Sequence, residues 1–219
     1  MRDQPIALST LRRLAWMALP VLASAGLVVE LLDHLAPAKS LRPWVELFSL
    51  SYEENLPTWY ASALLLTTAL LTTGHAARAR RYRRHWWFMA AALAYVSLDE
   101  VVQLHERLGD VFEGHGPLYF GWVIPAGVVV IVLAALYLPF LRDLPAATRR
   151  RFVIAAVVYV GGALLMELPL GLWTERFGDD SLGYALIDVV EETLELLGAT
   201  LFLGALIDHR EDHREEGAT

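Results

Sequence analysis

The sequence contains no cysteine, and this absence excludes several kinds of chemistry. Disulfides, thiolate nucleophiles, iron–sulfur clusters and thiolate-bound zinc all require cysteine sulfur, so any metal would be held by oxygen and imidazole ligands. Charged residues are also scarce, at 20% of 219 residues, whereas 56% are hydrophobic and the mean hydropathy is +0.42. This chain is too apolar for an ordinary soluble domain, and we expect the lipid bilayer to be its solvent.

Six stretches of the chain have the length and composition of membrane spans. A transmembrane helix needs about 20 mostly apolar residues to cross about 30 Å of hydrocarbon. Charged turns or turns with proline and glycine separate the stretches, which comprise residues 14–36, 56–74, 86–106, 117–141, 152–174 and 183–207. We find no linker long enough to separate two domains and no internal repeat. The sequence therefore predicts one all-α domain over residues 1–219, a polytopic bundle of six transmembrane helices.

The turns between the stretches alternate in charge, and this alternation predicts the orientation. Short cytoplasmic loops carry an excess of lysine and arginine. Arginines gather at the N-terminus, in the second and fourth turns and in the tail, while acidic residues gather in the odd-numbered turns. We therefore expect a plasma-membrane protein with both termini in the cytoplasm. Its net charge is −7, and its basic rim suits anionic lipid headgroups better than nucleic acid.

An alternative concerns the N-terminus. Arg12 and Arg13 precede an apolar run and residues 23–25, Ala-Ser-Ala, an order that is also typical of a signal peptide with its cleavage site. However, the apolar run continues past Gly26 to Val29, and cleavage would invert the alternation of loop charges. We therefore favour a retained first span.

Ionisable side chains lie within four of the stretches, where each is costly unless it is paired, hydrated or bound to an ion. The second and fourth stretches carry no charge, so we expect those two to face lipid. The candidate metal ligands are Glu30, Asp33 and His34 in the first stretch, Asp99, Glu100 and His105 in the third, Glu167 in the fifth, and Asp188, Glu191, Glu192 and Glu195 in the sixth. In the predicted topology all four groups fall in the outer half of the bilayer, and we expect them to form one site.

Helical spacing predicts how some of these side chains are directed. Glu30 and His34 are one turn apart, so both can chelate one ion, although a helix end emerging into water would explain them equally well. In the third stretch, Asp99, Gln103 and Glu106 are predicted to form one stripe. The sixth stretch carries its four acids at helical intervals before an apolar run, which a solvated helix face does not explain. Pro169, close to Glu167, marks a predicted kink.

Carboxylates packed in a medium of low dielectric constant need protons, a cation or water to offset their repulsion. Oxygen ligands with one or two imidazoles suit zinc, iron, manganese, calcium or magnesium. Ferritin-like carboxylate sites combine glutamates from two helices with Glu-x-x-His motifs from two others. The ingredients here are similar, but Glu30 and His34 are spaced by four, and the third and sixth stretches lack the motif.

Three motifs resemble a set found in uncharacterised bacterial and archaeal multi-pass membrane proteins. They are NLPTWY at residues 55–60, SLDE at 97–100 followed by His105-Glu106, and EETLELLG at 191–198. The resemblance covers most of the chain and implies no activity. In the first motif, Asn55 and Pro57 also predict a helix start, because asparagine caps free amides and proline is tolerated in the first turn.

A weaker similarity is to membrane hydrolases of the alkaline ceramidase and progestin-receptor-like superfamily, in which an acid pair and intramembrane histidines bind zinc. The similarity implies such roles for Glu30 and for Asp99 with Glu100. The late His-x-x-x-His of that family lies in a span, whereas His209 and His213 here fall in the predicted cytoplasmic tail.

We therefore expect an integral membrane protein that binds a divalent cation in an outward-side carboxylate and histidine cluster. As an enzyme, it would use the metal to activate water or dioxygen on a lipid-soluble substrate. As a transporter or channel, it would couple protons or cations to transport. As a structural subunit, in a homo-oligomer or a larger membrane complex, its acids would pair with another chain. The sequence leaves these alternatives open.

Overall fold

The computed structural model describes residues 4–109, 111–112 and 114–216, and this part of the chain is helical without β-strands. The helices are α1 (Gln4–Leu35), α2 (Arg42–Phe48), α3 (Leu56–Arg78), α4 (Arg83–Val102), α5 (Leu104–Gly109), α6 (Val123–Asp143), α7 (Ala146–Val160), α8 (Glu167–Phe177) and α9 (Leu182–Glu216). A 3-10 turn, Gly116–Leu118, precedes α6, and a π-helical segment, Gly161–Met166, joins α7 to α8. The all-α prediction is confirmed.

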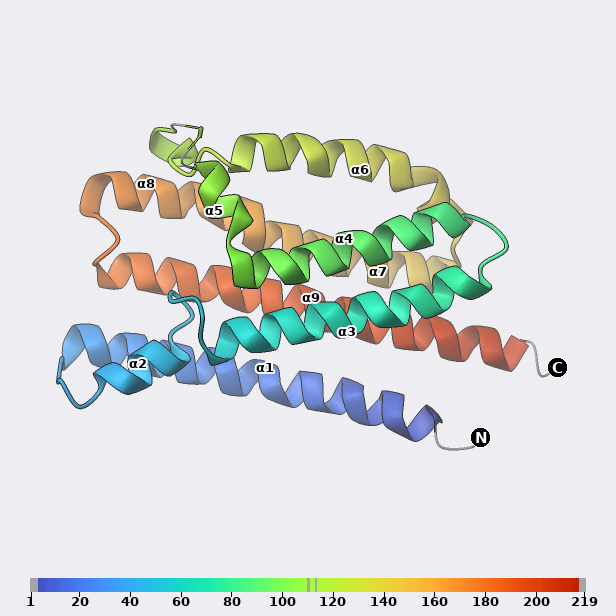
Figure 1. Ribbon diagram of the computed structural model, residues 1–219, viewed down its shortest axis with the longest axis horizontal. Helices are drawn as coiled ribbons and strands as arrows, with labels where there is room; N and C mark the ends of the chain where they lie inside the picture. Colours follow the sequence, from blue (N-terminus) through green and yellow to red (C-terminus); the bar gives the residue numbers. More distant parts are fainter. Residues whose placement is uncertain (1–3, 110, 113, 217–219) are drawn as a thin grey trace.

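Each of the six predicted stretches overlaps a long helix, namely α1, α3, α4, α6, the continuous α7–α8 rod, or α9, although the third stretch runs past the end of α4 and the fourth begins before α6. The long helices run side by side, and the N- and C-terminal ends lie at the same end of the bundle (Figure 1). Among the described residues, three helical segments are long and apolar enough to cross a membrane, namely Ala7–Leu35, Val123–Asp143 and Ala146–Phe177. An association with a membrane is thus supported for this all-helical chain.

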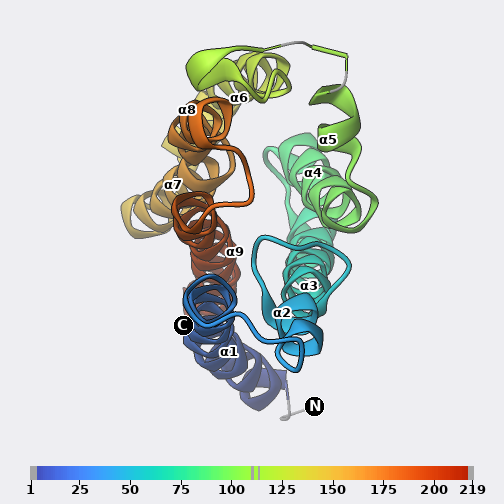
Figure 2. The ribbon, with the colours of Figure 1, turned by 90° about the vertical axis from the view of Figure 1, so that its left-hand side faces the viewer.

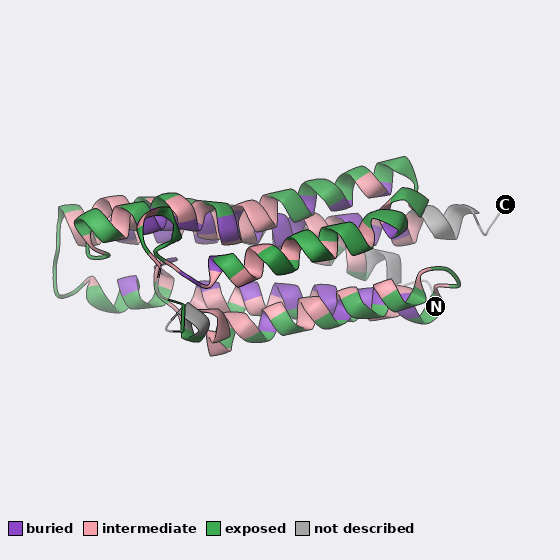
Figure 3. Cartoon of the chain, turned by 90° about the horizontal axis from the view of Figure 1, so that it is seen from above, coloured by how far each residue is buried: buried purple, intermediate pink, exposed green. Residues whose placement is uncertain are grey.

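Two rows of helices form the bundle. Viewed from the end opposite the termini, α1, α9, α7 and α8 make one row, and α3 and α4 lie opposite (Figure 2). The helix α9 connects the structure, because it packs along α7, α1, α3 and the π segment. Buried residues gather on the faces where helices meet, while exposed residues cover the outer faces (Figure 3).

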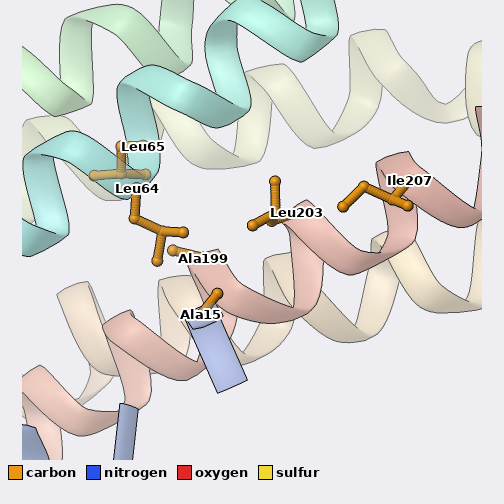
Figure 4. Packing of buried hydrophobic residues seen from close by; sticks show 6 residues of the cluster. All are labelled: Ala15, Leu64, Leu65, Ala199, Leu203 and Ile207. Carbon is orange, nitrogen blue, oxygen red and sulfur yellow. The ribbon is translucent and has the colours of Figure 1, made fainter. Parts of the chain in front are cut away.

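One buried cluster of the core consists mainly of leucine and alanine from α1, α3 and α9. Leu64, Ala199 and Leu203 belong to one buried cluster of these three helices (Figure 4). Glycine allows the closest approach of α7 and α9, since a Cβ at Gly198 would lie 2.5 Å from the backbone nitrogen of Tyr159. Small residues at such contacts let membrane helices approach closely.

The two uncharged stretches differ in their surroundings, because α3 buries one face and leaves Leu66 and Leu70 of its other face 47% and 62% exposed. The fourth stretch, α6, exposes its apolar side chains, with Ile131 72% exposed, as a helix facing lipid would. The second stretch, α3, instead buries Leu64, Leu65 and Thr68 against its neighbours. The absence of charge therefore does not distinguish a lipid-facing helix from a central one, because both are apolar.

The predicted helix start at residue 55 is confirmed. The Asn55 side chain accepts a hydrogen bond from the backbone N–H of Thr58 at 3.2 Å, and Pro57 occupies the first turn of α3. The same side chain donates through Nδ2 to the carbonyl oxygens of Ser49 and Tyr52, at 2.7 Å each. Asn55 thus caps α3 and also folds the preceding loop back against the bundle.

Candidate functional site

The acidic residues of α9 are directed into the bundle. Asp188 and Glu191 are only 8% and 6% exposed, while Glu192 and Glu195 are partly buried. Glu191 lies within electrostatic range of Glu167, Asp188 and Glu195. The stripe predicted from helical spacing therefore lies against other helices and is not a solvated face.

The π segment brings Glu167 to this stripe. A Cβ at Gly162 would lie 2.9 Å from the carbonyl oxygen of Glu191 and 2.9 Å from Cγ of Glu195, so only glycine allows this approach. Glu167 follows the segment as the first residue of α8 and is 8% exposed. The predicted irregularity near Pro169 thus takes the form of a π-helical turn that ends just before the acid. Such turns occur frequently at functional sites.

Tyr159 joins the third and sixth stretches, and the sequence analysis missed it. Its hydroxyl donates to Oε1 of Glu100 at 3.5 Å and also lies beside Glu195. Tyr159 precedes Glu167 by eight residues, about two helical turns in a regular α-helix. Hydroxyl groups are common in apolar helices, so no local pattern in the sequence marked this residue.

The predicted stripe of Asp99, Gln103 and Glu106 is wrong, because α4 ends at Val102. Gln103 adopts a left-handed conformation, with φ of 57° and ψ of 46°, and the chain starts again as α5. This turn brings His105 back onto Asp99. The backbone N–H of His105 donates to Oδ1 of Asp99 at 3.1 Å, and its Nδ1 lies 2.9 Å from Oδ2. The side chain of Glu106 lies outside the described residues.

An aromatic ring connects this pair to Glu167. The rings of His105 and Trp122 have centroids 4.9 Å apart. Nε1 of Trp122 donates to Oε1 of Glu167 at 3.1 Å. Trp122 lies just before α6 and was not among the predicted site residues, so the contribution of the fourth stretch is another omission of the sequence analysis.

The end of α1 contributes another buried carboxylate, that of Glu30, together with neighbouring polar side chains. Glu30 is 3% exposed, and the hydroxyl of Ser49 donates to its Oε1 in a very short contact. Nδ1 of His34 lies 2.9 Å from the carbonyl oxygen of Glu30 and 3.7 Å from Oε2. Asp33 is within electrostatic range of Arg42 and Tyr52, residues of α2 and the loop after it. The predicted pairing of Glu30 with His34 is thus observed, and Asp33 takes no part in it.

The loop before α3 connects Glu30 to α9. Ser51 lies beside Asp188, which is also within electrostatic range of Glu30. The short helix α2 precedes this loop, and residues 49–51 turn inward, so that Ser49 is fully buried. These serines are the third omission, because nothing in a polar loop sequence shows that it turns inward.

Seven carboxylates are thus linked by contacts or electrostatic interactions, and we call them the acid cluster. They are Glu30, Glu100, Glu167, Asp188, Glu191, Glu192 and Glu195. Buried oxygens Oδ2 of Asp188 and Oε2 of Glu191 have no hydrogen-bond partner among the described atoms. Within the described residues, no three or more histidine or acidic side chains are arranged to hold a metal ion. The predicted residues therefore converge, but not as a preassembled metal centre.

A separate aromatic and histidine group lies at the end of the bundle that carries the termini. The ring of Trp86 lies 5.1 Å from that of His75 and 5.5 Å from that of His209. His209 is 4% exposed, because α9 continues well beyond the predicted span end at Ile207. The placement of His209 in a tail is therefore wrong, whereas the side chain of His213 lies outside the described residues.

Comparison with known families gives one match. The family model described as Domain of unknown function (DUF8692) matches residues 13–209, a range that includes every member of the acid cluster. The chain belongs to this family. No curated protein and no solved structure matches the chain. The result agrees with the resemblance to uncharacterised membrane proteins and gives no support to the similarity with alkaline ceramidase-type hydrolases.

Proposed function

We propose that the chain is a six-span plasma-membrane protein whose acid cluster binds a divalent cation in the outward half of the bilayer. The observation that carries the proposal is the burial of Asp188 and Glu191, each with one carboxylate oxygen for which the described part of the chain offers no hydrogen-bond partner. A buried carboxylate in this position is stable only when it is protonated or lies beside a cation or water. Seven linked carboxylates in one interior region, four of them buried, favour an ion-binding role.

The arrangement of the helices supports the proposed topology. Six long helical rods lie side by side, and the turns at residues 79–82 and 144–145 lie at the same end as the termini (Figure 1). Arginines concentrate at that end, which the positive-inside rule assigns to the cytoplasm. A reporter enzyme fused after Thr219 should therefore be active in the cytoplasm, and one inserted at Lys39 should be active outside. The reverse result would overturn the orientation without bearing on the cation.

The ligands of the cation would come from α9 and the α7–α8 rod. Glu167, Glu191 and Glu195 supply carboxylates from two elements in contact, and Glu100 approaches through Tyr159. Carboxylates with an occasional imidazole suit manganese, iron, zinc, magnesium or calcium. Side-chain rotation would be needed for three of them to converge on one ion, and the π segment gives this part of the rod an irregular backbone in which to adjust.

In the enzymatic form of this proposal, Glu167, Glu191 and Glu195 would hold a metal that could supply activation of water or dioxygen for attack on a lipid-soluble substrate. The Asp99–His105 pair would then serve as general acid or base. A carboxylate 2.9 Å from Nδ1 fixes the orientation of an imidazole and stabilises its protonated form, as in many catalytic and metal-bound histidines.

A second candidate, proton-coupled transport, is favoured by one specific observation. A series of acidic and hydroxyl side chains runs from Glu100 through Tyr159, Glu195 and Glu191 to Asp188 beside Ser51, and its members are linked by hydrogen bonds or by electrostatic interactions. Chains of ionisable groups within membrane helices are typical of proton relays. This role requires no preassembled metal ligands.

One experiment separates the two candidates. The full chain, purified in mild detergent without chelators, would be analysed for metals, alongside Glu191→Gln and the matched control Glu46→Gln. Glu46 is an exposed acid paired with Arg42 on α2, away from the acid cluster. We expect stoichiometric metal in the wild type and in Glu46→Gln, and its loss in Glu191→Gln.

The absence of stoichiometric metal from the wild type would refute the proposed cation binding. In that case, the protein would be reconstituted in liposomes that contain a pH-sensitive dye. Proton flux that Glu191→Gln abolishes and Glu46→Gln preserves would support the transport candidate. If neither bound metal nor proton flux were detected, a structural role for the acids would remain.

A further inference from the structure

A groove of about 640 Å³ lies between α1, α7 and α9, towards the ends of these helices that lie near the termini. Arg12, Arg13, Arg151 and Asp208 line its polar part. Nη1 of Arg12 lies 2.7 Å from Oδ1 of Asp208, and Nη1 of Arg151 lies 3.3 Å from Oδ2. One carboxylate thus holds two guanidinium groups from different helices together. Three arginines against one aspartate leave the groove positively charged.

The remainder of the groove is apolar, and the charged and apolar parts follow one another along the helix axes. Trp16 lies about one turn beyond Arg12 along α1, Ile154 lies about one turn beyond Arg151 along α7, and Leu201 precedes Asp208 by about two turns along α9. On all three helices, the apolar residue is therefore farther from the termini than the charged one. Trp16 and Ile154 are 41% and 43% exposed, so their surfaces are available to a ligand.

Glycine gives the groove its depth. Gly204 lines it between the charged and apolar parts, and a Cβ there would meet nothing closer than Cδ of Arg12, at 4.0 Å. A larger side chain at this position would project into the groove without displacing a neighbouring helix.

We propose that this groove binds an anionic phospholipid of the cytoplasmic leaflet, with its phosphate among the arginines and an acyl chain along Trp16 and Ile154. Charge complementarity selects the occupant, because a basic pocket between membrane helices on the cytoplasmic side matches an anionic headgroup. The order of charged and apolar residues along the helices matches the order of headgroup and chain. The site is separate from the acid cluster and goes beyond the proposed cation binding.

The test uses the purified full chain in neutral detergent, with phosphatidylglycerol and phosphatidylcholine of identical acyl chains. Native mass spectrometry would measure lipid affinity for the wild type, Arg13→Gln, Gly204→Leu and the control Arg142→Gln. Arg13 is chosen because both ion pairs to Asp208 stay intact. Arg142, in the last turn of α6, is an arginine outside the groove.

We expect the wild type to bind phosphatidylglycerol more tightly than phosphatidylcholine. Arg13→Gln should lower the affinity for phosphatidylglycerol about fivefold, because one positive charge near the headgroup is lost. Gly204→Leu should weaken the binding of both lipids, whereas Arg142→Gln should leave the binding of both unchanged. Glycerol phosphate, which lacks acyl chains, should not compete with phosphatidylglycerol for the groove. Equal affinity for the two lipids, or equal effects of Arg13→Gln and Arg142→Gln, would overturn the proposal. A dimer that excludes lipid and dissociates in Gly204→Leu would instead assign the groove to a second copy of the chain.

Discussion

The contact of Gly162 with α9 allows the geometry of the acid cluster to be tested directly. A methyl group at residue 162 would lie 2.9 Å from the carbonyl oxygen of Glu191, whereas ordinary van der Waals contacts begin at 3.4 Å. Gly162→Ala therefore forces the π segment and α9 apart by about half an ångström, and overpacking of this kind costs about 1–3 kcal/mol. The same displacement moves Glu191 and Glu195 relative to Glu167.

Gly161→Ala is a matched control in the same segment. Nothing lies within 4 Å of a Cβ at Gly161, and alanine in a helix interior is favoured over glycine by about 0.5–1 kcal/mol. Thermal unfolding in detergent and metal content per chain would be measured for both variants. For a chain of this size, each kcal/mol shifts the Tm by about 2–4 °C. We expect a lower Tm and less metal for Gly162→Ala alone. Equal Tm values and metal contents for the two variants would refute the close packing of the π segment on the acid cluster.

Three further substitutions test individual elements of the site. Ser49→Ala removes the hydrogen-bond donor to buried Glu30 and should lower the free energy of unfolding by about 1–3 kcal/mol. Ser49→Thr keeps a hydroxyl donor and should lose less stability. Identical stability of the wild type and both variants would contradict the contact. Gln103→Gly should raise the Tm, because glycine adopts the left-handed conformation of this residue without a steric penalty, and Gln103→Val should lower it. An unchanged Tm in both variants would contradict the left-handed turn. Asn55→Ala should cost at least about 1 kcal/mol in denaturant unfolding through loss of the α3 cap, and Asn55→Ser, which keeps a capping oxygen, should recover part of that loss. An equal loss in both variants would point to the loop contacts of Nδ2 instead.

Local signals explain which parts of the fold could be predicted. The helices of the six stretches follow from long apolar runs, and the start of α3 follows from Asn55 and Pro57, because capping depends on neighbouring residues alone. Burial of α3 could not be predicted in this way. An uncharged helix is compatible with lipid on one side or with other helices on all sides, and only the packing of α4 and α9 against it decides between them.

The composition of the candidate site was predicted better than its geometry. The acids of α9 and Glu167 were found because charges are rare in apolar helices. Ser49 and Tyr159 were missed because hydroxyl groups occur commonly in both loops and helices and carry no such signal. Contacts between elements far apart in sequence, such as Trp122 with Glu167, depend on the tertiary arrangement and leave no local pattern.

The departures from regular helix geometry occur where the candidate site is built. Gln103 takes a left-handed conformation that brings His105 onto Asp99, and the π segment immediately precedes Glu167. A strained backbone residue and a π-helical turn each cost free energy that a continuous α-helix would avoid, and burial of unpartnered carboxylate oxygens adds to that cost. A fold under selection for stability alone would have little reason to combine them. Their position beside the Asp99–His105 pair and the acid cluster supports the proposed binding of a cation or protons over a purely structural role for these acids.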